Sequence, residues 1–133
     1  IGLIEPKNAD ANTPRFALPF DAVAGITTGI STADRAETVR RALDPESGPD
    51  DFVIPGHILP LAAQRAGLAA RRGHTEGSVE LAHLAGLFPA AVMSEVMAPA
   101  GHMARGEELM AFAARTGSKL IDIAQIAEAA LNG

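Results

Sequence analysis

A short basic string, Arg71-Arg72-Gly73-His74-Thr75, stands directly before a segment with helical periodicity. The first N–H groups of a helix lack partners within the helix, and the helix dipole makes that end positive. A glycine lets a ligand approach the backbone, a threonine hydroxyl donates, and an arginine offers a forked donor. Together these groups suit a phosphate or a carboxylate. On spacing alone, a surface loop with Thr75 as a helix cap is the simpler interpretation.

Glu95 is a second candidate, because it interrupts the otherwise apolar segment 89–97. This segment predicts a buried strand, and strand alternation places Glu95 on the same face as Met93 and Met97. A carboxylate among such neighbours needs a cationic partner, a metal or a proton. An ion pair at the end of a strand accounts for Glu95 equally well, so a functional and a structural role both stay open.

Two histidines could transfer protons or bind a metal. His57 follows Pro55-Gly56, and these two residues restrict the backbone in a way that would aim the side chain. A buried, hydrogen-bonded histidine is an equally good interpretation of His57. His74 could ligate a metal or act as an acid or base, although on its own it is more simply explained as a structural histidine.

Helices and strands alternate along the sequence, which predicts a single compact domain of the α+β (mixed α/β) class. Apolar residues at helical spacing predict helices from Thr32 to Leu43, from Thr75 to the glycine at 86, and over 107–115 and 123–131. Gly117 closes the helix over 107–115. Ser31 or Thr32 caps the first helix, and Thr75 caps the second. Strands are predicted over 16–23, 89–97 and 120–123, short extended pieces over 52–62, and connectors over 5–15, 44–51 and 64–74.

Composition excludes several classes of protein. The chain has 133 residues, a net charge of −5, 4% aromatic residues and no cysteine. Without cysteine there is no disulfide, thiolate metal site or cysteine nucleophile. The negative charge and the few aromatic residues argue against binding to nucleic acid. No run reaches the roughly 18 apolar residues of a membrane span, so we expect a cytoplasmic protein with no membrane partner.

Taken in order, several strings resemble one family of enzymes, 3,4-dihydroxy-2-butanone 4-phosphate synthase of riboflavin biosynthesis. They are TTGISTADR (27–35), DF (51–52), PGHILPL (55–61), RRGHTE (71–76), LAGL (84–87), PA (89–90), Glu95 and MAR (103–105). The resemblance runs from about Phe16 to Ile123. Separate motifs in the right order are far more specific than any one of them.

The resemblance implies a lyase that converts ribulose 5-phosphate to 3,4-dihydroxy-2-butanone 4-phosphate and formate. The implied cofactor is Mg²⁺, with Mn²⁺ as an alternative, and the implied assembly is a homodimer. His57 and Glu95 would be the catalytic groups that transfer protons. His74 would ligate the metal, and segment 27–35 would belong to the architecture of the site. The substrate would be bound by Arg71, Arg72, Gly73, His74, Thr75 and Glu95.

The sequence also departs from the family. The family carries an acidic segment of the type Arg-Glu-x-Glu-x-x-Asp near its N-terminus, which supplies another metal ligand, and residues 1–15 contain no match to it. The chain begins at Ile1 without a methionine. We therefore expect this segment to lie upstream of Ile1 and the 133 residues alone to be inactive. Two alternatives stay open: a non-catalytic homologue that binds sugar phosphates, and a diverged enzyme for another sugar phosphate.

Overall fold

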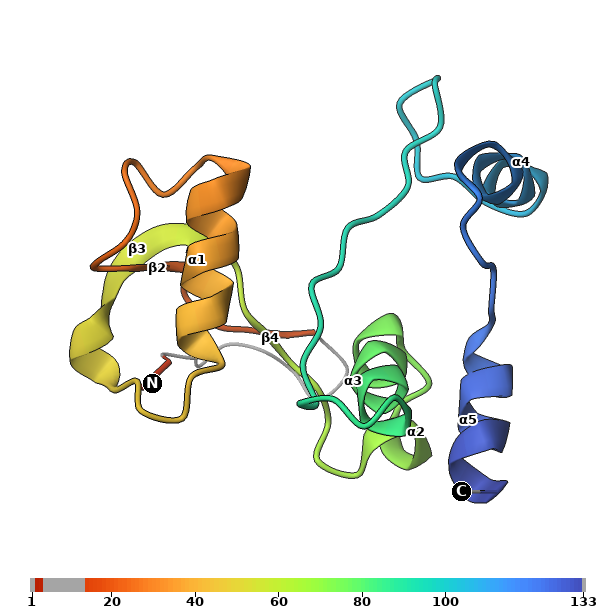
Figure 1. The fold of residues 1–133 in the computed structure, drawn as a ribbon. Coiled ribbons are helices and arrows are strands. Elements are labelled where there is room, and N and C mark those ends of the chain that lie inside the picture. The colour runs from red at the N-terminus through yellow and green to blue at the C-terminus, as the bar shows by residue number, and fades with distance from the viewer. Residues whose placement is uncertain (1, 4–13, 133) are drawn as a thin grey trace. The chain divides into compact units, whose positions relative to one another are not determined.

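The computed structural model describes residues 2–3 and 14–132. The chain divides into two compact units, Ile1–Ala63 and Gln64–Gly133. The paired strands belong to the first unit, whereas the second unit is built on helices (Figure 1). Helices and strands together confirm the predicted α+β class. The connector expected over 5–15 lies almost wholly outside the described residues.

The first unit contains two antiparallel strand pairs. Strand β1 (Arg15–Phe16) pairs with β4 (Leu61–Ala62), and β2 (Phe20–Ala22) pairs with β3 (Phe52–Ile58). The strand predicted over 16–23 is therefore two short strands separated at 17–19. Pro19 lies in that gap, and a proline has no N–H to donate to a sheet.

The register between β2 and β3 is irregular at one point. Phe20 pairs with Ile58, but its neighbour Asp21 pairs with Val53, so residues 54–57 bulge out of the ladder. An irregularity of this kind changes the direction of a side chain within a sheet. Here it affects His57, which lies in the bulged segment.

Helix α1 (Thr32–Ala42) packs on β2 and β3 in the first unit. Its N-terminus is capped as predicted, because the hydroxyl of Ser31 accepts a hydrogen bond from the Asp34 N–H at 3.0 Å. The buried Thr38 hydroxyl accepts from the Ala22 N–H at 3.1 Å, which ties the helix to β2. A short 3-10 helix, η1 (Pro49–Asp51), precedes β3.

The second unit contains helices α2 (Gly67–Ala70), α3 (His74–Leu84), α4 (Glu107–Thr116) and α5 (Ile123–Asn132). Helix α3 packs against α2 and α5. At Gly77 an added Cβ would stand 3.6 Å from both Ile123 and Ile126, so α5 approaches this face of α3 closely. Helix α4 ends at Gly117, whose φ of 69° is left-handed, as its position predicted.

Four sequence predictions about these elements are wrong. Segments 89–97 and 120–123 are not strands: within the described residues, the backbone of 89–97 forms one isolated bridge, Met97 to Met103. An apolar run favours a strand, but a strand also needs a neighbour for its backbone groups. The connector 64–74 contains the short helix α2. Thr75 does not cap α3; Gly73 stands at the N-cap, and Thr75 is buried inside the helix.

Candidate active site

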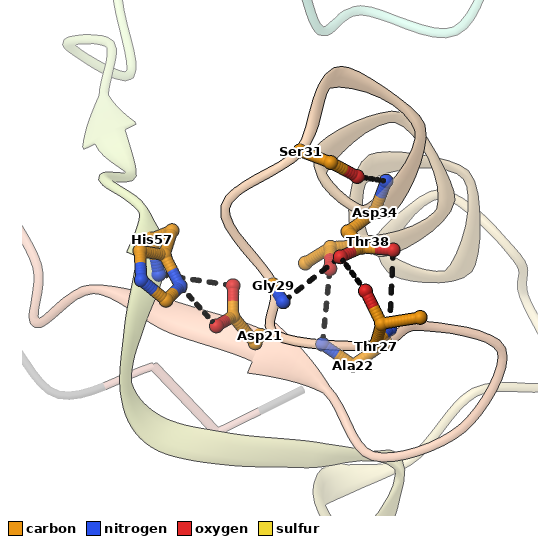
Figure 2. Close-up of polar contacts among 8 residues, drawn as sticks. All are labelled: Asp21, Ala22, Thr27, Gly29, Ser31, Asp34, Thr38 and His57. Carbon is orange, nitrogen blue, oxygen red and sulfur yellow. Dashed lines mark hydrogen bonds and ion pairs between the residues drawn. The ribbon is translucent and has the colours of Figure 1, made fainter.

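His57 is held by Asp21, a residue on the neighbouring strand (Figure 2). One carboxylate oxygen of Asp21 accepts the backbone N–H of His57 at 2.9 Å, and the other lies 2.6 Å from the ring Nδ1. A carboxylate only accepts hydrogen bonds, so Nδ1 donates. In the neutral ring Nε2 then carries the lone pair. The His57 side chain is 40% exposed and that of Asp21 only 7%, so His57 is the accessible member of the pair.

A second carboxylate, Asp34, fixes the turn that precedes α1. It accepts hydrogen bonds from the Thr27 hydroxyl at 2.8 Å, the Thr27 N–H at 3.1 Å and the Gly29 N–H at 3.0 Å. The bond from the Thr27 hydroxyl holds the pKa of Asp34 below its ordinary value; burial opposes this shift, and the two N–H bonds add to it. The motif 27–35 is therefore a turn organised around one ionised carboxylate.

Gly29 brings this turn against the His57–Asp21 pair. An added Cβ at Gly29 would overlap the Asp21 carboxylate and stand 2.7 Å from Nδ1 of His57. The φ of Gly29 is also 85°, which favours glycine. The structure thus brings the 27–35 motif and His57 together within the first unit.

In the second unit, the buried carboxylate of Glu76 holds Arg71. Glu76 accepts hydrogen bonds from Nη1 of Arg71 and from the Gln64 N–H, both at 3.0 Å. Burial opposes ionisation of Glu76, but the Gln64 N–H, its own N–H and the charge of Arg71 outweigh burial and lower the pKa of Glu76. The Arg71 side chain is 35% exposed against 1% for Glu76, so part of the guanidinium stays accessible.

The predicted anion-binding string surrounds the N-terminus of α3. Gly73 is the N-cap, and an added Cβ there would stand 2.6 Å from both Arg71 Nη1 and Glu76 Oε2, so only glycine fits without displacing that pair. Arg72 and His74 are exposed, whereas Thr75 is buried. The string therefore offers Arg71, Arg72 and His74 toward solvent at the positive end of a helix.

Glu95 lies in the second unit, in the irregular segment 89–97, and is exposed. The expectation of a carboxylate inside a buried strand is wrong, because the strand does not form. Because Glu95 is exposed, water can solvate its charge and no buried partner is required. Its role as a proton carrier remains a prediction that depends on the family motif.

His74, the predicted magnesium ligand, is exposed at the first position of α3. Across the described ranges, no group of three or more His, Asp or Glu side chains gathers where it could hold a metal ion. Magnesium prefers several oxygen ligands, and His74 offers a ring nitrogen. These residues alone do not fit a complete magnesium site, so His74 as a metal ligand remains a prediction.

Sequence reasoning missed Asp21 and Glu76. Asp21 interrupts the apolar run 16–23 in the same way that Glu95 interrupts its own run, and this signal could have identified it. Glu76 directly follows Thr75 in the anion-binding string, but its burial depends on helix packing that a local pattern does not reveal.

Known proteins are similar to this chain in sequence and in structure. A family model for 3,4-dihydroxy-2-butanone 4-phosphate synthase matches residues 1–129. A synthase of that name from Chromobacterium violaceum is 46% identical over 122 residues, which cover 92% of this chain and 58% of the relative. The crystal structure of the Candida albicans synthase has a TM-score of 0.82 and 45% identity, covering 86% of this chain and 59% of that one.

A further synthase structure, determined in complex with two magnesium ions, has a TM-score of 0.76 and 37% identity over 91% of this chain and 62% of its own. The chain thus spans somewhat more than half the length of each of these relatives. The family model covers nearly all of the chain, and the Chromobacterium violaceum synthase is 46% identical over 92% of it. The chain belongs to the 3,4-dihydroxy-2-butanone 4-phosphate synthase family.

Proposed function

We propose that this chain carries part or all of a 3,4-dihydroxy-2-butanone 4-phosphate synthase, a lyase that converts ribulose 5-phosphate to 3,4-dihydroxy-2-butanone 4-phosphate and formate for riboflavin biosynthesis. The observation that carries the proposal is the His57–Asp21 pair in a member of this family. The two products together contain the atoms of ribulose 5-phosphate, so the net reaction needs no oxidant, reductant or second substrate.

His57 would begin the reaction by removing a proton from the carbon beside the substrate carbonyl. The C–H bond breaks, an N–H bond forms at Nε2, and the electron pair moves to the carbonyl oxygen as an enediolate. Asp21 stabilises the positive charge that the ring then carries, because its carboxylate accepts the Nδ1 hydrogen at 2.6 Å. Later proton transfers in the dehydration and carbon shift need a second group, and the family motif assigns this role to Glu95.

The N-terminus of α3 would bind the substrate phosphate. The guanidinium of Arg71 is oriented in advance by Glu76, and Arg72 and His74 are exposed beside it. An arginine held by a carboxylate loses little further freedom when it binds a phosphate. These local charges attract an anion although the chain as a whole has a net charge of −5.

The remaining parts of the proposal depend on the family. Mg²⁺ would supply charge stabilisation for the enediolate oxygens when bound, Mn²⁺ could replace it, and His74 is the ligand that the motif assigns on this chain. The described residues do not complete that site by themselves. A homodimer and a cytoplasmic location are proposed on the same basis. In the described part of the chain, no helix has the length and apolar character to span a membrane.

Formate release tests this proposal. The full gene product is incubated with ribulose 5-phosphate and Mg²⁺, and formate is measured with a formate dehydrogenase assay. Ribulose without phosphate is the control, and it should react far more slowly because the Arg71 subsite then has no ligand. Formate from ribulose 5-phosphate supports the proposal. Absence of formate, with folded protein and Mg²⁺ present, would overturn it.

A further inference from the structure

We propose that Asp21 is the positioning residue for His57: it keeps the hydrogen on Nδ1 and turns Nε2 toward the substrate. The consequence for catalysis rests on the proposed function, because it requires His57 to exchange protons with ribulose 5-phosphate. The consequence for the imidazole ring does not depend on any activity and can be measured separately.

Asp21 binds His57 at two points. One oxygen accepts the backbone N–H at 2.9 Å, and the other lies 2.6 Å from Nδ1. Two bonds from one carboxylate to one residue fix both the backbone and the ring. The bulge over residues 54–57 makes this arrangement possible, because it moves His57 out of the regular ladder beside Asp21.

The side chains of Asp21 and His57 differ strongly in exposure. The Asp21 side chain is 7% exposed and lies behind a ring that is 40% exposed. If the carboxylate were exposed, water would compete for it, and its bond to the ring would contribute little to holding the ring in place. A buried carboxylate instead keeps its hydrogen bond to Nδ1 while the rest of the ring remains open to a ligand.

Two glycines approach the His57–Asp21 pair closely. Gly29 approaches so closely that a Cβ would overlap the carboxylate, and its N–H is held by Asp34 (Figure 2). Gly56 is packed against the backbone of Phe20 and Asp21 so closely that it also leaves no room for a Cβ. A turn, a bulge and two glycines thus restrict the positions that Asp21 and His57 can take.

The variant Asp21→Asn separates positioning from a merely structural role. Asparagine has nearly the same shape, and its carbonyl oxygen can still accept the His57 N–H. Its amide group donates, so Nδ1 must become an acceptor and the ring hydrogen moves to Nε2. We therefore expect Asp21→Asn to keep the fold and to reverse the tautomer.

The test uses nitrogen NMR of the ¹⁵N-labelled full gene product, with His57→Gln to assign the ring signals. The wild type is expected to show hydrogen on Nδ1, and Asp21→Asn is expected to show it on Nε2. In the formate assay, kcat of Asp21→Asn should fall by about 100-fold or more, as expected for a wrong tautomer, while KM changes by less than about threefold. Asp50→Asn, the same change at an exposed position of the first unit, should alter neither readout.

Asp21→Glu keeps an acceptor at Nδ1 and should restore the wild-type tautomer and part of kcat. The same tautomer in wild type and Asp21→Asn, or an unchanged kcat in that variant, would overturn the proposal. If the wild type releases no formate but the tautomers differ as expected, the proposed function fails while the positioning of the ring by Asp21 stands.

Discussion

Nη1 of Arg71 lies 3.0 Å from Oε2 of Glu76, and the carboxylate is buried whereas the arginine is partly exposed. This relationship orients the guanidinium of Arg71 at the N-terminus of α3. It also explains the glycine at position 73, where a Cβ would stand 2.6 Å from each of these two atoms. The Arg71 guanidinium, which is proposed to bind phosphate, is therefore oriented by a buried carboxylate of the second unit.

Replacing Arg71 should weaken phosphate binding more than replacing Arg72. Arg71 is held in place by Glu76, whereas Arg72 is an exposed side chain that must lose its freedom on binding. We expect Arg71→Lys to raise KM for ribulose 5-phosphate by about tenfold and Arg72→Lys by less than about threefold, because lysine keeps the charge and loses the fork. Inhibition by inorganic phosphate measures the same difference without turnover. Equal losses of phosphate affinity in the two variants would contradict the assignment of Arg71 as the main phosphate-binding residue.

The variant Glu76→Gln should lower stability and loosen Arg71. Glutamine can still accept the Gln64 N–H, but it loses the charge that pairs with Arg71. We expect the free energy of unfolding to fall by about 1–3 kcal/mol in urea titrations. Glu128→Gln, at an exposed position of α5, is the matched control and should change it by less than about 0.5 kcal/mol. Equal effects of the two variants would show that Glu76 contributes no more to the free energy of unfolding than an exposed carboxylate does.

Stability should fall in acid, and Glu76 should contribute to that loss. Its pKa is lower in the folded chain than its ordinary value of 4.5. A lowered folded-state pKa stabilises the fold above the unfolded pKa, and this contribution disappears as the pH falls through the folded pKa. Urea titrations from pH 7 to pH 3 should therefore show a smaller loss in Glu76→Gln than in the wild type. Identical pH dependence in both proteins would rule out this role of Glu76.

The variant Gly29→Ala should damage the first unit and the His57–Asp21 pair together. A methyl group there meets the Asp21 carboxylate, and the backbone φ of 85° is unfavourable for alanine. We expect a loss of about 1–3 kcal/mol in the free energy of unfolding from the strained backbone. Gly48→Ala is the control, because a Cβ there would meet nothing within 4 Å. A tolerated Gly29→Ala with unchanged His57 ring signals would contradict this packing.

The sequence was sufficient to predict elements that are defined locally. Ser31 predicted the start of α1 and Gly117 the end of α4, because capping depends on a few adjacent residues. The prediction of a strand over 89–97 is wrong because strand formation depends on a neighbour that can be distant in sequence. The apolar Val92 in this segment is 79% exposed.

The candidate site was predictable in part for the same reason. The basic string at 71–75 could be located from residue types alone, and the resemblance supplied the role proposed for His57. Asp21 was missed because it lies 36 residues from His57, and only the irregular register of β2 and β3 brings the two together. The burial of Glu76 likewise arises from packing within the second unit.

The most direct measurement uses the full gene product, and compares the formate and 3,4-dihydroxy-2-butanone 4-phosphate that the wild type and His57→Gln release from ribulose 5-phosphate with Mg²⁺ present. The wild type should release the two products in equal amounts. Loss of the proton-transferring ring should reduce the rate by about 100-fold or more, the usual contribution of a general base. No formate from the folded wild type, or a wild-type rate in His57→Gln, would contradict the account.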